Sequence, residues 1–230
     1  MSTRNRFAVS IIGAAIALLV VSPIASAQNG GAIAPRIVSW SCSGCHRVDG
    51  NAPLPDFPRL AGFEASYIEQ KVAAFQAAPA LPADELVYRL VKPAASRKIA
   101  ASSSPEALAY MVGIAHATTP QEAKAAAAWY SAQKPAHGHS ANPALVEKGK
   151  AVFENGPPGK GVIACQVCHG AQGVGVAGAP RLGGQNSSYL VNQLLRYRAG
   201  ARLDAPEMTS SAKQLDSEQI RAVSAFLASR

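Results

Sequence analysis

The spacing of hydrophobic residues in the C-terminal part of the chain predicts helices. Asn142 and Pro143 suit the start of a helix, because asparagine accepts a hydrogen bond from a free backbone N–H and proline fits the first helical turn. Apolar or small residues then recur on one face of this helix, at Leu145, Gly149, Val152 and Phe153. A second predicted helix begins at Ser187 or Ser188 and ends at Gly200, and it contains Tyr189, Leu190, Leu194 and Tyr197.

Two further helices are predicted from capping residues and apolar spacing. Asp216 or Ser217 caps the last helix, whose apolar face consists of Ile220, Val223, Phe226 and Leu227. In the N-terminal half, Thr119 and Pro120 begin a counterpart that ends near Tyr130. No run of residues alternates between apolar and polar over the length of a strand. The chain is therefore predicted to be all-α, with each half a small bundle of helices.

The chain repeats one unit of three sequence blocks. The blocks keep their order in both halves, and matched residues are offset by 123 positions in the first block, 122 in the second and 97 in the third. Because the third offset is 25 shorter than the second, the first half holds an extra segment of that length, at about 79–104. The matched blocks are SCSGCHRVDG (41–50) with ACQVCHGAQG (164–173), FPRLAGFEASY (57–67) with APRLGGQNSSY (179–189), and MVGIAHATTPQEAKAAAAWYSA (111–132) with MTSSAKQLDSEQIRAVSAFLAS (208–229).

The first residues have the pattern of a secretory signal peptide. Arg4 and Arg6 precede an uncharged apolar run, and Ala25-Ser26-Ala27 is a cleavage site of small residues. We therefore expect a signal peptide at 1–27, export to the periplasm, and a mature chain that begins at Gln28. The alternative is that the apolar run is kept as an anchor. No later segment is long and apolar enough to cross a membrane, so no transmembrane span is expected after cleavage.

Composition also suggests where the repeated units meet. The segment SAQKPAHGHSAN, residues 131–142, contains the Pro, Gly and Ser that are typical of a linker. We place the first domain at 28–133, including the extra segment, the linker at 134–142 and the second domain at 143–230.

The mature chain is predicted to be basic. Removing residues 1–27 takes two arginines from the 22 basic residues, which leaves 20 against 14 acidic residues. The basic residues are scattered, so nucleic acid is not an expected partner of this exported chain. An acidic partner protein fits the charge better, and residues 136–230 carry a net charge of +4 against +2 for residues 28–135.

All four cysteines lie in two CxxCH motifs. An exported chain with an even number of cysteines can form disulfides, and two CxxC pairs also have the spacing of a four-cysteine zinc site. The histidine after each pair favours a third interpretation, because neither a disulfide nor zinc requires it there. In covalently bound haem c, the two thiols link to the porphyrin and the histidine binds the iron. The sequence therefore predicts two haem c groups, one held by Cys42, Cys45 and His46 and the other by Cys165, Cys168 and His169.

The two methionines other than Met1 occupy matched positions in the repeat. Met111 and Met208 are therefore the predicted sixth ligands of the two irons. A thioether favours ferrous iron, and a filled sixth position excludes substrate, so this ligation suits an outer-sphere electron carrier. Met208 follows Pro206 in a stretch that resembles a loop. Met111 lies in a segment that could be a continuous helix, where it could simply pack in the core, and His116 is a rival ligand five residues later.

Residues near each motif are candidates to support the haem. Pro58 lies 12 residues after His46, and Pro180 lies 11 after His169, so that each proline carbonyl could accept a hydrogen bond from the imidazole N–H. Four more residues could pair with the haem carboxylates, the alternative being an ordinary place on the helix surface. They are Arg59, Arg181, Tyr67 and Tyr189.

The order of CxxCH, Pro-x-Leu-x-Gly and a methionine ahead of a terminal helix resembles the plan of class I c-type cytochromes. Two such units behind a signal peptide are similar to the di-haem cytochrome c4 family, and the resemblance covers nearly all of residues 34–230. It implies two tandem all-helical cytochrome c domains whose haems face each other across an interface. It also implies a protein that shuttles electrons in the periplasm, commonly toward terminal oxidases.

Two features depart from that family pattern. The first half has little room between Gln28 and Cys42 for the usual N-terminal helix, which the second half has at 143–154. The extra segment at 79–104 is also longer than the pattern expects. It could cover the edge of the first haem, form a surface for a partner, or displace Met111.

The predicted function is one-electron transfer by a soluble di-haem carrier between redox proteins of a respiratory chain. The expected donor is a cytochrome complex or a dehydrogenase, and the expected acceptor is a terminal oxidase or a similar protein. One alternative is a cytochrome subunit of a periplasmic dehydrogenase complex. Another is an enzyme of the di-haem peroxidase type, which needs an open iron position that only the first haem could offer. A cysteine-ligated haem enzyme would need a fifth cysteine, which the chain lacks.

Overall fold

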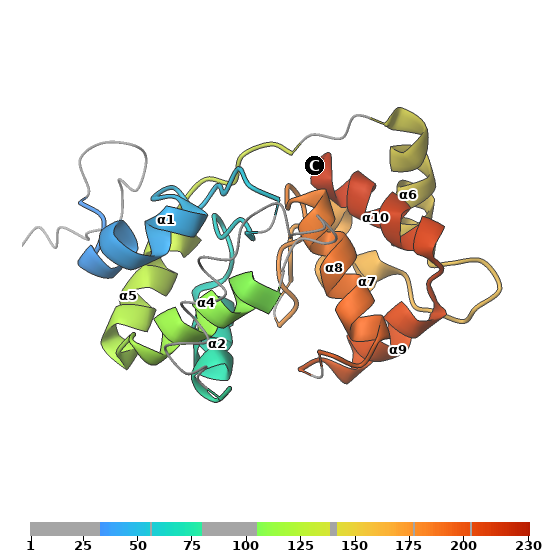
Figure 1. The fold of residues 1–230 in the computed structure, drawn as a ribbon. Coiled ribbons are helices and arrows are strands. Elements are labelled where there is room, and N and C mark those ends of the chain that lie inside the picture. The colour runs from blue at the N-terminus through green and yellow to red at the C-terminus, as the bar shows by residue number, and fades with distance from the viewer. Residues whose placement is uncertain (1–32, 56, 80–104, 139–141, 177, 203) are drawn as a thin grey trace, which may run out of the picture. The chain divides into compact units, whose positions relative to one another are not determined.

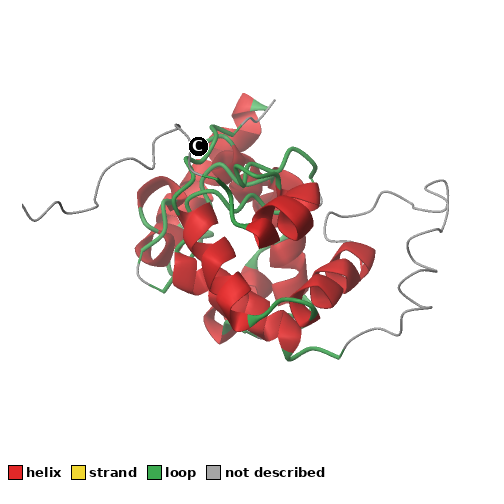
Figure 2. Ribbon diagram, turned by 90° about the vertical axis from the view of Figure 1, so that its left-hand side faces the viewer, coloured by secondary structure: helices red, strands yellow, loops and turns green. Residues whose placement is uncertain are grey.

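The computed structural model describes residues 33–55, 57–79, 105–138, 142–176, 178–202 and 204–230, all within one compact unit at 33–230. Every regular element in these ranges is a helix or a helical turn, apart from an isolated bridge between Val176 and Ala179 (Figures 1 and 2). The all-α prediction is confirmed. The predicted signal peptide and nearly all of the extra segment, from residue 80 to 104, lie outside the described residues.

The N-terminal half contains four α-helices and one π-helical turn among the described residues. Helical backbone runs from Arg36 to His46, so the first half has a short helix leading directly into its CxxCH motif, where the second half has a longer separate one. The continuous helix considered around Met111 is present. The elements are η1 (Val38–Cys42), α1 (Ser43–His46), α2 (Ala65–Gln76), α4 (Pro105–His116) and α5 (Pro120–Ser131).

The start of α5 follows from local sequence, as predicted. The Thr119 hydroxyl accepts a hydrogen bond from the Glu122 N–H, and the Glu122 carboxylate accepts one from the Thr119 N–H. This reciprocal capping box satisfies two of the backbone N–H groups that a helix N-terminus leaves free. Pro120 occupies the first helical turn, where its missing N–H costs nothing.

The three helices predicted in the C-terminal half, α6, α8 and α10, begin at the predicted residues. The Asn142 side chain caps the N-terminus of α6 by accepting from the Leu145 N–H, and Asp216 forms a capping box with Gln219 at the start of α10. The described elements of this half are α6 (Pro143–Asn155), α7 (Cys165–His169), the 3-10 turn η3 (Ala171–Gly173), α8 (Ser187–Arg198), α9 (Pro206–Gln214) and α10 (Ser217–Ala228).

The prediction of a loop around Met208 is wrong. Pro206 and Met208 lie in the first turn of helix α9. Proline is tolerated there because its nitrogen would have no partner in the first turn of a helix. The helix carries few apolar residues, so hydrophobic spacing alone gave little sign of it.

Helices α6 and α10 cross at a glycine. Gly149 is buried, and a Cβ atom at its position would overlap the carbonyl of Ala222 on α10. One helical turn later, the rings of Phe153 and Phe226 lie 5.4 Å apart. The cluster around them consists of Val152, Phe153, Leu190, Leu215, Ile220, Val223, Phe226 and Leu227.

The N-terminal half has a separate hydrophobic cluster. Tyr130 on α5 is 1% exposed, and its hydroxyl donates a hydrogen bond to the carbonyl of Arg47, 3.0 Å away, just after the first motif. This contact ties the end of α5 to α1. The cluster consists of Ile37, Val38, Phe63, Ile68, Ala126, Ala127 and Tyr130.

Backbone carbonyls and amide side chains link the two halves. The Asn186 Nδ2 lies within hydrogen-bonding distance of the carbonyls of Leu54 and Phe57, 2.9 Å from each. The N–H of Gly138 donates to the carbonyl of Arg230, 3.1 Å away. The presence of one cluster in each half agrees with two domains, while the boundaries placed at 134–142 stay a prediction.

Candidate functional site

The first CxxCH motif lies at the junction of η1 and α1. Cys42 ends η1, and Cys45 and His46 lie within α1, so the helical turn places all three residues close together. The four cysteines, all among the described residues, form no disulfide. The part of the chain that the structure describes holds no group of three or more His, Cys, Asp or Glu side chains able to bind a metal. In the described part of the chain, the four cysteines therefore neither pair with one another nor gather into one four-cysteine group.

A cavity of about 350 Å³ lies beside this motif. Its wall includes both thiols, His46 and Met111, which comes from α4. The remaining wall is largely apolar, as expected of a pocket that excludes water from a bound organic group. The apolar side chains come mainly from α2 and α4 and from the chain between α1 and α2, and they include Leu60, Phe63, Ile68, Val72, Phe75, Leu108 and Ile114.

Met111 and His116 lie on the same helix but in different environments. Met111 lines the cavity, whereas His116 is exposed at the C-terminal end of α4 and is not part of the wall. The Nε2 of His116 lies 2.8 Å from the carbonyl of Ala78. This hydrogen bond holds His116 at the end of α2, so Met111, and not His116, is the residue of α4 that could bind a haem iron in this cavity; the assignment stays a prediction.

The imidazole of His46 is held by the expected proline carbonyl. Its Nδ1 lies 2.9 Å from the Pro58 oxygen, so the protonated Nδ1 donates and Nε2 is left with a lone pair for a metal. The ring is buried, and burial lowers the pKa of His46 although the bond to Pro58 opposes that shift. A neutral imidazole with a fixed tautomer is the form that binds iron.

The second motif has the same local geometry. Cys165, Cys168 and His169 lie on the short helix α7, and the His169 Nδ1 is 3.0 Å from the carbonyl of Pro180. Burial lowers the pKa of His169, again against the effect of its hydrogen bond. Gly170 ends the helix with a φ of 74°, a backbone conformation that glycine adopts without strain.

Met208 is half-buried in the first turn of α9. Its pairing with His169 rests on its matched position in the repeat and stays a prediction.

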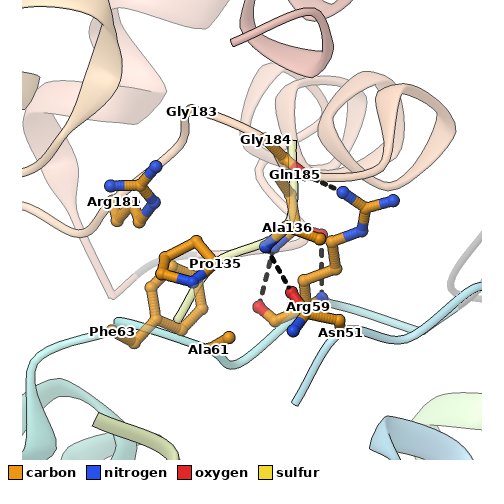
Figure 3. A pocket seen from close by; sticks show the side chains of 10 residues that line it. All are labelled: Asn51, Arg59, Ala61, Phe63, Pro135, Ala136, Arg181, Gly183, Gly184 and Gln185. Atoms are coloured by element: carbon orange, nitrogen blue, oxygen red, sulfur yellow. Dashed lines mark hydrogen bonds between the residues drawn. The ribbon is translucent and has the colours of Figure 1, made fainter. Parts of the chain in front are cut away.

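The predicted carboxylate partners separate into two pairs. Tyr67 and Tyr189 line the large cavity, although Tyr189 comes from the C-terminal half. Arg59 and Arg181 instead line a second pocket of about 10 Å³, which has room for about one water molecule (Figure 3). The Arg59 Nη1 donates to the carbonyl of Gly184, 2.7 Å away, while the Arg181 Nε is buried without a hydrogen-bond partner.

Four charged residues of the large cavity were missed from the sequence. Lys71 comes from α2, Arg196 from α8, and Arg202 and Asp204 from the loop after α8. The only sequence signal was the place of Lys71 one turn after Tyr67, on the same face of α2. The other three lie more than 140 positions from the motif that they approach, and the repeat matches Arg196 with the uncharged Ala74.

The residues of the large cavity fit a covalently bound haem. Two thiols, an oriented imidazole and a thioether are the groups that bind haem c, and the apolar wall suits its flat ring. The buried Nε of Arg196, which has no hydrogen-bond partner, suits its acidic edge.

Comparison with known proteins decides the family. The family model for cytochrome c matches residues 146–230. The chain is 34% identical over 191 residues to cytochrome c4 of Stutzerimonas stutzeri, which covers 81% of this chain and 82% of that protein. The chain belongs to the cytochrome c4 family.

Two further proteins are similar to this cytochrome c4 homologue. A crystal structure of reduced recombinant cytochrome c4 from Pseudomonas stutzeri has a TM-score of 0.66 at 32% identity, covering 82% of this chain and 92% of that chain. The thiosulfate dehydrogenase electron acceptor of Stutzerimonas stutzeri strain A1501 is 28% identical over 226 residues, covering 94% of this chain and 92% of that protein.

Family membership confirms the predicted fold and cofactor. The chain has two tandem class I cytochrome c units and takes two covalently bound haem c groups. None of the helices in the described ranges combines the length and the apolar character that a membrane span requires.

Proposed function

We propose that the chain is a periplasmic one-electron carrier between redox proteins of a respiratory chain. The observation that supports this most directly is that Met111 shares one cavity with Cys42, Cys45 and His46. A histidine and a methionine on opposite sides would leave the iron no open position for a substrate. The chain would then exchange electrons with partners without binding a small molecule at the metal.

The residues of the site keep the ligands in place during electron exchange. When bound, haem c supplies an iron that gains or loses one electron. Pro58 holds the His46 ring through its carbonyl, and Phe57 packs edge-on against that ring at 6.4 Å. Met111 is carried on α4, and the apolar wall excludes water from the thioether side. Because these contacts hold the side chains of the site in place when its charge changes, such a site suits fast electron transfer.

The surface around the second motif supports docking of a partner there. Two apolar side chains of this region are strongly exposed, Ile163 at 70% and Val167, inside the motif, at 66%. Val174 and Val176 add exposed apolar surface just after His169. An apolar contact within a positively charged half is what a transient complex with an acidic redox protein requires. We place the electron-exchange surface of the second haem here.

A redox titration of the purified protein, followed by optical and magnetic spectroscopy, tests the proposal. We expect two haems for each chain and a methionine–iron signature from both. An iron with an open position, or one that binds cyanide or peroxide readily, would contradict the carrier proposal and favour an enzyme. Recovery of the mature protein from the periplasmic fraction, with cleavage before Gln28, tests the location separately.

Two of the relatives favour a dehydrogenase as the electron donor. This donor is a second, narrower proposal. One is the thiosulfate dehydrogenase electron acceptor of Stutzerimonas stutzeri strain A1501, described above. The other is the thiosulfate dehydrogenase electron acceptor of Thiomonas intermedia, which is 30% identical to this chain over 200 residues. We propose that this chain accepts electrons from a periplasmic dehydrogenase of that kind. Mixing the oxidised chain with a thiosulfate dehydrogenase and thiosulfate should reduce both haems in stopped-flow absorbance, and an unchanged spectrum would contradict this donor.

A further inference from the structure

The cavity beside the first motif is lined by charged groups from both halves of the chain. Besides the residues of α1, α2 and α4, its wall includes Arg196 of α8 and the pair Arg202 and Asp204. Lys71 of α2 faces them. The acidic and basic groups therefore gather at one haem site, although most of them belong to the half that carries the other haem.

Asp204 is shared by two of these cations. The Arg202 Nε donates to one carboxylate oxygen at 2.8 Å, and its Nη2 donates to the other at 3.1 Å. The Lys71 Nζ also donates to Asp204. Arg202 is further held by Gln193, at 2.7 Å from its Nη1, and its guanidinium stacks 4.5 Å from the centre of the Tyr197 ring. One carboxylate thus serves two positive charges.

No acidic residue in the described ranges pairs with Arg196 in this way. It lines the cavity, and its Nε is buried without a hydrogen-bond partner. A buried N–H of a charged group is costly unless an anion or an acceptor satisfies it. Among the described residues, Asp204 is the only acidic one that lines this cavity, and it is already bound by Arg202 and Lys71.

The charges of the described wall leave an excess of two. Of the charged side chains in that wall, Lys71, Arg196 and Arg202 are positive and Asp204 is negative. A haem carries two carboxylates, which equal this excess in number and are opposite to it in sign. We infer that Arg196, together with Arg202, binds the carboxylates of the haem attached at Cys42 and Cys45, so that the C-terminal half completes the haem site of the N-terminal half.

In this arrangement, the reduction potential of the first haem depends on the C-terminal half of the chain. A carboxylate without a partner near the iron stabilises the ferric state, because the negative charge offsets the extra positive charge of the metal. An arginine bound to that carboxylate cancels the effect and favours the ferrous state. Arg196 is therefore a positioning residue that raises the potential of the first haem. The inference rests on the haem site described above, but not on the identity of any redox partner.

The test is a redox titration of the full chain, loaded with both haems, in three variants. Arg196→Gln removes the charge, Arg196→Lys keeps it without the two-pronged geometry, and Arg198→Gln makes the same charge change on α8 outside the cavity. NMR contacts between Phe57 and its haem identify which potential belongs to the first centre. Arg196→Met, which keeps the aliphatic stem, replaces the glutamine variant if that variant does not fold.

We expect Arg196→Gln to lower the potential of the first haem and leave the second nearly unchanged. Arg196→Lys should restore most of the loss, and Arg198→Gln should have little effect on the first haem. An unchanged first potential in Arg196→Gln, with both haems present and both methionine–iron signatures intact, would overturn this inference and leave the carrier proposal standing. Missing methionine–iron signatures in the unmodified chain would instead count against the carrier proposal.

Discussion

Arg59 and Gln185 exchange two hydrogen bonds although they lie 126 positions apart in the chain. The Arg59 N–H donates to the Gln185 Oε1 at 2.9 Å, and the Gln185 Nε2 donates to the Arg59 carbonyl at 3.0 Å. Gln185 is only 4% exposed. The pair joins the residue after Pro58, which orients His46, to the segment that precedes α8, so that support for the first haem extends into the second half (Figure 3).

Replacing Gln185 with alanine should destabilise the chain. The change leaves the N–H and carbonyl of Arg59 without these partners, and unsatisfied buried groups cost about 1–3 kcal/mol each. We expect a loss of about 2 kcal/mol in the free energy of unfolding, measured by denaturant titration of the haem absorbance. Gln214→Ala, at an exposed position, is the matched control. Equal losses of unfolding free energy in both variants would show that the hydrogen bonds between Arg59 and Gln185 do not stabilise the chain.

Replacing Met111 with alanine should open the sixth position of the first iron. The potential of that centre should fall by a sizeable part of the roughly 0.8 V range that axial ligands span, since the thioether stabilises ferrous iron. The variant should also bind carbon monoxide, which optical spectra detect. His116→Ala should leave both properties unchanged, because His116 bonds to the Ala78 carbonyl outside the cavity. If His116→Ala alone opened the iron, the ligand assignment would be reversed.

Acidification should weaken the contact between Asp204 and its cations. Burial would raise the pKa of Asp204, but hydrogen bonds from Arg202 and Lys71 outweigh burial and lower the pKa well below its usual range. The stabilisation is therefore fully present above about pH 4, the usual pKa of aspartate, and declines as the pH falls further. The difference in unfolding free energy between the unmodified chain and Asp204→Asn should shrink below that pH. A difference that stayed constant down to pH 3 would contradict this account.

Enlarging Gly149 should separate helices α6 and α10. A methyl group there would overlap the carbonyl of Ala222, so Gly149→Ala should destabilise the second half by roughly 1–3 kcal/mol despite the better helix propensity of alanine. Thermal unfolding followed by circular dichroism measures the change. Gly44→Ala is the control, since a Cβ at Gly44 has no heavy atom within 4 Å, and it should be neutral or slightly stabilising.

Several parts of the structure could be predicted from the sequence because they depend on neighbouring residues. Thr119, Asn142 and Asp216 cap helices through bonds that reach only three positions along the chain. The motif spacing places two thiols and an imidazole on one turn of helix. The contact between His46 and Pro58 was predictable because it spans only 12 residues, and the repeat places Pro180 at nearly the same spacing, 11 residues after His169.

Other features were misjudged or left open because local sequence carries little information about them. Helix α9 has few apolar residues, so periodicity did not reveal the helix that contains Met208. Arg59 was expected at the haem carboxylates, but its guanidinium bonds to the carbonyl of Gly184. Met111 and His116 are both plausible ligands on one helix, and only the position of the cavity separates them.

The sequence by itself determined the cofactor chemistry, the duplicated helical plan and the orientation of the proximal histidines, since these depend on short spacings that survive in any compact fold. Only the tertiary structure decided that Arg196 and Arg202 line the haem cavity of the other half. These arginines lie more than 140 positions from the motif beside that cavity. Their placement depends on how the two halves pack, for which no local propensity or repeat match provides a signal.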